Sequence, residues 1–208
     1  MKLSTMQLDE FASVLGSDAP APGGGSCAAL AGALGSALTA MVSALTLGKK
    51  KYMDSWEIAQ KTKEKADDLR LKLMEAIDSD TEAFNVVSDA FGMPKGTDEE
   101  KAKRSAAIQE GLVGCTESPL HIMELSVEAL AFAEGLMGHF NTSAASDLGV
   151  SVLMLKTALL SAWLNVKINI GSLKDKEKAA SYEAKGKAIL ETAIPKADAL
   201  YQAIEESL

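Results

Sequence analysis

The segment from Ala19 to Gly48 carries no charged side chain, and Ala, Gly, Ser and Thr make up most of it. It is long enough to cross a bilayer, which takes about 20 apolar residues. Its many small side chains give it a modest transfer free energy compared with a Leu-rich span. Small residues recur at Ala28, Gly32 and Ser36, so a neighbouring backbone can approach closely. We therefore expect a buried central helix over residues 26–47.

Charge and cysteine content limit the partners and the compartment. The formal net charge of −8 argues against general binding to nucleic acid or to an anionic membrane, because either partner requires a basic face. Cys27 and Cys115 are too few for a disulfide framework in 208 residues, which favours buried thiols in a reducing compartment. We expect a cytoplasmic protein without nucleic-acid or membrane partners. The alternative, a membrane-embedded protein that uses the uncharged helix, predicts extraction only with detergent.

Helical periodicity covers nearly all of the rest of the chain, and no segment shows the alternation of a strand. Residues 54–57 and 97–100 each have the pattern of a capping box, and Ser118-Pro119 has the pattern of a helix start. Pro195 is expected to kink the last helix. One helix is expected to start at Thr97. The other expected helices span residues 3–15, 26–47, 54–91, 118–137, 143–170 and 172–208. The sequence thus predicts one all-α domain over residues 1–208, a bundle of long antiparallel helices.

An acidic residue, Asp80, interrupts the apolar stripe of the expected helix 54–91. At about 100° per residue, Asp80 falls in the middle of this stripe and Asp78 points the opposite way. Burial would raise the pKa of the Asp80 carboxyl into a range useful for proton transfer. A structural acid bonded to a backbone group or a lysine explains the same pattern. The apolar members of the stripe are Leu69, Leu73, Ala76, Ile77, Phe84, Val87 and Phe91.

Polar residues also gather on one face of the expected helix 143–170. Between Leu148 and Ile170 its only charges are Lys156 and Lys167, so most of it should be buried. This pattern indicates the edge of a ligand site, and a hydrogen-bond network between helices is the alternative. The polar residues of that face are Asp147, Ser151, Asn165 and Asn169.

The two ends of the uncharged helix carry features suited to an anion. The segment PAPGGGS at residues 20–26 places three glycines before the helix, where N–H groups can converge on one acceptor and the helix dipole favours negative charge. Three lysines follow its far end at residues 49–51. In so acidic a chain, this cluster is where an acidic small molecule would bind. A flexible connection and a solvated charge run are the alternatives.

Five segments carry a resemblance to a known family. In chain order they are PAPGGGS, GKKKY, IDSDTEAF, MPKGTDEEKAKRSAAIQEGL and NTSAASDLGVSVLMLKTALLSAWLNVKINI. Together they resemble the cyclodeaminase/cyclohydrolase family of folate enzymes. That family includes the cyclodeaminase half of formiminotransferase-cyclodeaminase and stand-alone methenyltetrahydrofolate cyclohydrolases. Because 208 residues leave no room for a formiminotransferase half, the stand-alone form is the nearer match.

The resemblance implies an all-helical fold, a homodimer and roles for particular residues. Asp80 matches the proton donor of the family. The candidate folate-binding groups are Gly23, Gly24, Gly25, Ser26, Lys49, Lys50, Lys51, Ser146, Asp147, Asn165 and Asn169.

The same resemblance implies chemistry on 5,10-methenyltetrahydrofolate. A cyclohydrolase opens its ring to 10-formyltetrahydrofolate, and a cyclodeaminase forms the ring from formiminotetrahydrofolate with release of ammonia. Both reactions need one general acid/base, and the sequence does not separate them. A non-catalytic folate-binding helical dimer is a further alternative. We expect no metal and no cofactor beyond the folate, because His121 and His139 are isolated from other metal-binding residues.

Overall fold

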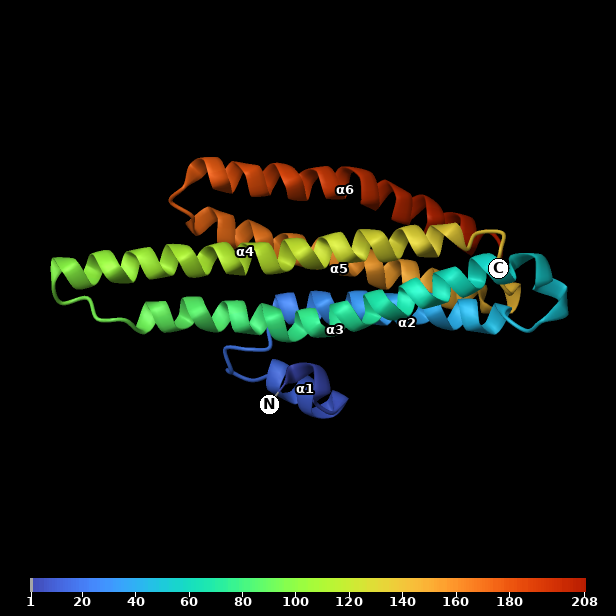
Figure 1. The fold of residues 1–208 in the computed structure, drawn as a ribbon, viewed down its shortest axis with the longest axis horizontal. Coiled ribbons are helices and arrows are strands. Elements are labelled where there is room, and N and C mark those ends of the chain that lie inside the picture. The colour runs from blue at the N-terminus through green and yellow to red at the C-terminus, as the bar shows by residue number, and fades with distance from the viewer. Residues whose placement is uncertain (1) are drawn as a thin grey trace.

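The structure, a computed structural model, describes residues 2–208, and every regular element in them is helical. Figure 1 shows the long helices side by side, with α6 (Lys176–Glu205) along one edge. Short 3-10 helices lie at Leu3–Thr5, Lys50–Ser55 and Thr142–Ala144. The α-helices are α1 (Leu8–Leu15), α2 (Gly24–Thr46), α3 (Trp56–Gly92), α4 (Asp98–Gly135), α5 (Ala145–Ser172) and α6 (Lys176–Glu205).

Neighbouring helices of the bundle run in opposite directions. At the start of α2, Gly25 faces Asp80 of α3. At the other end of α2, the Leu45 carbonyl accepts a hydrogen bond from the amide of Asn141, which precedes α5, at 3.2 Å. The N-terminal segment lies beside α3, where Ser4 donates to the Asp78 carboxylate through its backbone N–H at 3.3 Å. The predicted all-α bundle of long antiparallel helices is confirmed.

The small residues of α2 let it lie at the centre of the bundle. A Cβ added at Gly32 would come within 3.0 Å of the Leu73 side chain, and one at Gly35 within 2.7 Å of Leu155. The contact at Gly35 is closer than packed side chains allow, and the contact at Gly32 is tighter than most of them. The predicted burial of this helix is therefore confirmed for one part of its surface, whereas Leu34, Met41 and Leu45 are exposed. The helix begins at Gly24, two residues earlier than expected.

Two stretches, Gly24–Thr46 and Thr142–Ser172, are long and apolar enough to cross a membrane. About half of the most apolar part of each is buried inside the bundle. The core helix of a soluble protein meets the same criteria of length and composition. Length and hydropathy therefore do not decide between the two settings.

The capping patterns had mixed outcomes. At residues 97–100 the predicted box is confirmed, since Thr97 Oγ1 accepts from the Glu100 N–H and the Glu100 carboxylate accepts from the Thr97 N–H. At residues 54–57 the predicted box is wrong, because a 3-10 helix leads directly into α3 and the Ser55 side chain caps nothing. The expected helix 3–15 is broken between Thr5 and Leu8. The last helix begins at Lys176, because Asp175 caps it by accepting from the Lys178 N–H at 2.9 Å.

The predicted helix start at Ser118-Pro119 is also wrong. Pro119 lies inside α4, which continues from Asp98 to Gly135. A proline within a helix has no N–H for the carbonyl four residues earlier, here that of Cys115. Asn169 of α5 donates to this carbonyl through Nδ2 at 2.6 Å. A side chain from the neighbouring helix thus satisfies the carbonyl that the proline leaves free. Pro195 likewise lies inside α6.

Candidate active site

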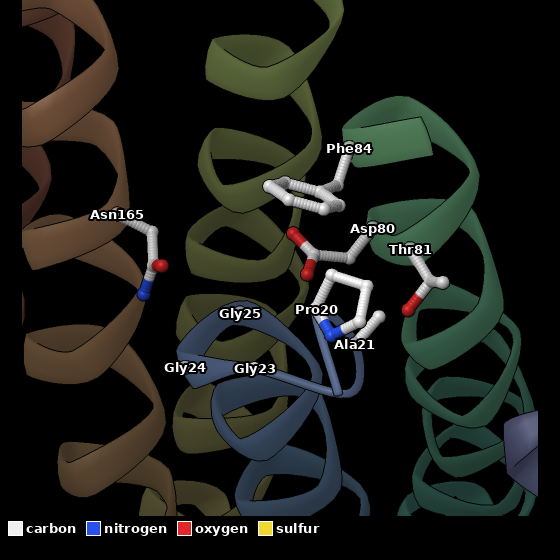
Figure 2. A pocket seen from close by; sticks show the side chains of 9 residues that line it. All are labelled: Pro20, Ala21, Gly23, Gly24, Gly25, Asp80, Thr81, Phe84 and Asn165. Carbon is white, nitrogen blue, oxygen red and sulfur yellow. The ribbon is translucent and has the colours of Figure 1, made fainter. Parts of the chain in front are cut away.

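Asp80 projects from α3 toward the N-terminal end of α2. A Cβ added at Gly25 would collide with both oxygens of the Asp80 carboxylate. Only glycine at position 25 therefore lets the carboxylate approach the α2 backbone so closely. Figure 2 shows the carboxylate above the glycine segment, with Phe84 on its far side. Ser118 of α4 lies on a third side, with Oγ 3.5 Å from Asp80 Oδ1.

The surroundings of Asp80 act on its pKa in opposite directions. Burial raises the pKa of the Asp80 carboxyl above its usual value, while hydrogen bonds from the Ser118 hydroxyl and from the hydroxyl and backbone N–H of Ser26 lower it. Burial is the larger influence, so the pKa is raised. The ionised form nevertheless has donors and the positive end of the α2 dipole beside it. This arrangement lets one carboxyl both accept and return a proton.

Two cavities meet at Asp80. The smaller, of about 190 Å³, is lined by the glycine segment and the residues before it (Figure 2). The larger, of about 350 Å³, extends along α3 and α5 and has more apolar walls. Asp80, Phe84 and Asn165 line both cavities. A ligand that fills both would place its middle beside the carboxyl group.

The predicted site residues divide into two groups. The structure brings Gly23, Gly24 and Gly25 together with Asp80 and Asn165 around the smaller cavity. Asn169 lines the larger one. Ser26 lies behind the carboxylate, and its Oγ is 3.3 Å from Thr81 Oγ1.

The second group lies at the opposite end of α2. Lys49, Lys50 and Lys51 follow its C-terminal end, which a helix of 23 residues places about 35 Å from Gly24. Ser146 and Asp147 stand at the start of α5, close to this same end. Within one chain, these five residues do not join the cavities at Asp80. Their predicted contact with a folate stays a prediction.

Two polar residues of the α5 face have partners on neighbouring helices: Asn169 donates to the Cys115 carbonyl of α4, and Ser151 bonds to α2. Ser151 is buried, and its hydroxyl is 2.8 Å from Thr39 Oγ1 and donates to the Gly35 carbonyl at 2.7 Å. At these two positions hydrogen bonds between helices, the alternative interpretation, are therefore present. Within residues 2–208 no group of three or more His, Cys, Asp or Glu could hold a metal ion. Metal-free chemistry remains a prediction.

The sequence pattern missed several members of the site. Ser118 was assigned to a helix start, and Phe84 was assigned to the core, although 38% of its surface is exposed. Thr81 and Cys115 also line the cavities. The serine could have been found by treating the helix across Pro119 as continuous, since that places Ser118 on the inner side of α4.

Comparisons with known proteins show which family the chain belongs to. The family model described as formiminotransferase-cyclodeaminase matches residues 7–188. The chain is 44% identical over 169 residues to the methenyltetrahydrofolate cyclohydrolase of Methylorubrum extorquens, and the match covers 81% of each protein. It is 33% identical over 175 residues to the formimidoyltransferase-cyclodeaminase of Gallus gallus, with 84% of this chain and 32% of that protein covered.

A solved structure shares the fold. The formiminotetrahydrofolate cyclodeaminase of Thermotoga maritima matches with a TM-score of 0.83 at 24% identity, over 100% of this chain and 98% of that one. The resemblance predicted from the five sequence segments is thus confirmed by the family match and by the relatives. The chain belongs to the formiminotransferase-cyclodeaminase family of enzymes.

Proposed function

We propose that this protein is a methenyltetrahydrofolate cyclohydrolase, which opens 5,10-methenyltetrahydrofolate to 10-formyltetrahydrofolate with Asp80 as the general acid/base. The observation that carries the proposal is a carboxyl group of raised pKa at the junction of two cavities. The 44% identity to a protein named for this activity supports the same conclusion.

The arrangement suits the shape of the substrate. Its reactive carbon bridges N5 of the pterin and N10 of the aminobenzoyl group, so the two ring systems extend from it in different directions. The two cavities likewise extend from Asp80. With one ring system in each cavity, the bridging carbon lies beside the carboxyl group. The substrate folate and water are the only small molecules that the reaction requires, and no metal or further cofactor enters the proposal.

Asp80 takes part in two proton transfers of the reaction. The Asp80 carboxylate takes a proton from a water molecule while the water oxygen bonds to the bridging carbon. In the tetrahedral intermediate, protonated Asp80 gives that proton to N5, and the bond between the carbon and N5 breaks. The hydroxyl proton leaves to solvent, and the formyl group remains on N10. Ser26, Ser118 and the start of α2 stabilise the carboxylate before and after these steps.

The second candidate is formiminotetrahydrofolate cyclodeaminase activity, which the relative from Gallus gallus favours. In that reaction N10 attacks the formimino carbon, and Asp80 protonates the departing ammonia. The same carboxyl group serves both reactions, so the site geometry agrees with either.

A parallel assay separates the candidates. The purified protein is offered methenyltetrahydrofolate and formiminotetrahydrofolate, and methenyl absorbance and ammonia are followed. Loss of methenyl absorbance above the rate without enzyme indicates the cyclohydrolase. Gain of absorbance together with ammonia indicates the cyclodeaminase. Binding of tetrahydrofolate without turnover of either substrate would leave a non-catalytic folate-binding dimer.

The proposal extends to a cytoplasmic homodimer without nucleic-acid or membrane partners. Neighbouring helices α2 and α5 expose large apolar side chains, which a second copy of the chain would cover. Since α2 separates the three lysines at residues 49–51 from Asp80, a lysine contact to a folate bound there would have to come from a second copy. The exposed apolar residues are Leu34, Met41, Leu45, Val150, Leu153, Leu160, Leu164 and Ile168.

Sedimentation tests the dimer. Without detergent, the wild-type protein should sediment as a dimer at micromolar concentration, and Leu164→Glu should shift it to the monomer. Leu71→Glu is the matched control, because Leu71 is 53% exposed on α3 and not on the α2/α5 face. A wild-type monomer would contradict the dimer, and extraction only with detergent would favour the membrane alternative.

A further inference from the structure

The amide group of Asn169 has one permitted orientation. Its Nδ2 donates to the carbonyl of Cys115 at 2.6 Å and to the carbonyl of Asn165 at 2.9 Å. A flipped amide would direct Oδ1 at two carbonyl oxygens and leave the Cys115 carbonyl without a donor, which is unfavourable. Because Pro119 has no N–H for the Cys115 carbonyl, this carbonyl of α4 accepts from the Asn169 amide and fixes its orientation.

The amide group of Asn165 is held in the same way. Its Nδ2 donates to the Ser161 carbonyl at 2.9 Å, so its Oδ1 is the atom left for the cavity. Figure 2 shows this oxygen on the side of the amide that faces Asp80. Among residues 2–208, no donor makes a hydrogen bond to Oδ1 of Asn165 or of Asn169. The larger cavity is therefore lined by two acceptors, Oδ1 of Asn165 and Oδ1 of Asn169, and both N–H groups of the Asn169 amide are already in use.

The two acceptors define the kind of ligand edge that fits them. Residues four apart on a helix stand about 5–6 Å from each other, so the two oxygens lie along one wall. Phe84, Leu112 and Ile168 give the same cavity apolar surfaces. The complementary ligand is a flat ring system with several N–H donors along one edge. A tetrahydropterin has such an edge in its 2-amino group, N3–H and N8–H, and an aminobenzoyl ring does not.

We propose that Asn165 and Asn169 accept hydrogen bonds from the N–H edge of the pterin, and so place the pterin in the larger cavity with N5 on the side of Asp80. The proposal rests on folate being the substrate of this site. Asn169 lies one helical turn farther from the junction than Asn165, which lines both cavities. When Asn169 binds the N–H donors of the pterin at that distance, the opposite end of the ring, which carries N5, points toward the Asp80 carboxyl group.

The test is a cycle that combines a changed ligand with a changed protein. The ligands are tetrahydrofolate and its analogue with a methyl group in place of the 2-amino group. Their dissociation constants are measured with the wild-type protein, Asn165→Ala and Asn169→Ala. A site built to bond a donor rejects a ligand that lacks it, so the wild-type protein should bind the analogue about tenfold to hundredfold more weakly. In Asn169→Ala this preference should fall to within about threefold.

Structural damage is distinguished from lost recognition within the same cycle. Structural damage from losing the Nδ2 hydrogen bonds weakens the binding of both ligands equally. The ratio of their dissociation constants then stays unchanged. Asn85→Ala, the same change at an exposed position of α3, should keep the wild-type preference. In assays of methenyltetrahydrofolate hydrolysis, the Asn variants should raise KM and also lower kcat, because a pterin that is held less firmly places N5 less accurately beside Asp80.

The outcomes separate this inference from the proposed function. Turnover of methenyltetrahydrofolate together with an unchanged ligand preference in both Asn variants overturns the inference alone. If the wild-type protein binds no tetrahydrofolate and turns over neither substrate, the proposed function and the inference both fail.

Discussion

The two ends of α2 differ in what their polar groups do. At the N-terminal end, Asp80 and Asn165 face shared cavities, and Gly25 admits the carboxylate to the helix backbone. At the C-terminal end, polar groups bond to one another, as where the Thr46 hydroxyl accepts from the Asn141 N–H at 2.8 Å. The lysines there are exposed. Segments that together identify a family therefore need not form one site within one chain.

Replacing Asp80 should have the largest effect on catalysis. General acid/base catalysis contributes about 10²–10⁴-fold, so Asp80→Asn should lower kcat by about that factor and leave folate affinity within a few-fold. The measurement is steady-state turnover of methenyl- and formiminotetrahydrofolate by folded protein. Asp78→Asn is the control on the same helix and should turn over nearly as wild type, although Asp78 also accepts hydrogen bonds from Ser4. Wild-type rates in Asp80→Asn would make Asp80 a structural acid.

Adding one methyl group at Gly25 should have the next largest effect. The new Cβ would collide with the Asp80 carboxylate and displace it, and misplacement by about 1 Å can cost on the order of 10²-fold in rate. We expect Gly25→Ala to lower kcat by about tenfold to hundredfold. Gly23→Ala is the matched control, because a Cβ there meets nothing within 4 Å. Equal kcat values for the two variants would contradict the close approach.

Neutralising the lysines should have a smaller effect, confined to binding. If Lys50 and Lys51 bind the acidic tail of a folate, Lys50→Ala and Lys51→Ala should raise KM for a polyglutamylated substrate a few-fold at low salt and leave kcat unchanged. The effect should shrink as salt increases, because exposed charges are screened. A monoglutamylated substrate serves as the control. Unchanged KM at low salt would limit the site to the Asp80 end.

The smallest expected effect is on stability as a function of pH. Burial raises the pKa of Asp80 in the folded protein, so between the unfolded and folded pKa values the folded state binds more protons. Stability contributed by this group is then lost as pH rises through that window. The melting temperature of Asp80→Asn relative to wild type should therefore increase from about pH 4 upward, to a plateau above the folded pKa. A constant difference would show that the Asp80 pKa is not raised.

The sequence predicted the parts of the site that follow a helical period. Asp80 was found because an acid interrupts the apolar stripe that contains Leu73 and Ile77. The side chains of Leu73 and Ile77 are both buried. Ser118 was missed because Ser-Pro commonly starts a helix, whereas α4 continues through Pro119, and Asn169 of α5 bonds the carbonyl that the proline leaves free.

Periodicity also left the relation between motifs undetermined. It places Gly23 and Lys49 at the two ends of one helix, and it does not say which neighbouring element each end meets. That depends on the antiparallel packing of α2 with α3 and α5, which is a tertiary property. The same limit explains why Ser151 and Asn165, on one face of α5, have different surroundings.

Pro119 lowers the stability of α4 and at the same time helps to order the site. Pro119→Ala would supply the N–H that a regular helix directs at the Cys115 carbonyl, and a proline inside a helix costs roughly 3 kcal/mol. The new N–H at position 119 would then compete with Nδ2 of Asn169 for the Cys115 carbonyl. Engineering for heat resistance would thus select the alanine at the expense of a fixed amide in the cavity. Position 119 is a place where a trade-off between stability and activity should be measurable in a single substitution.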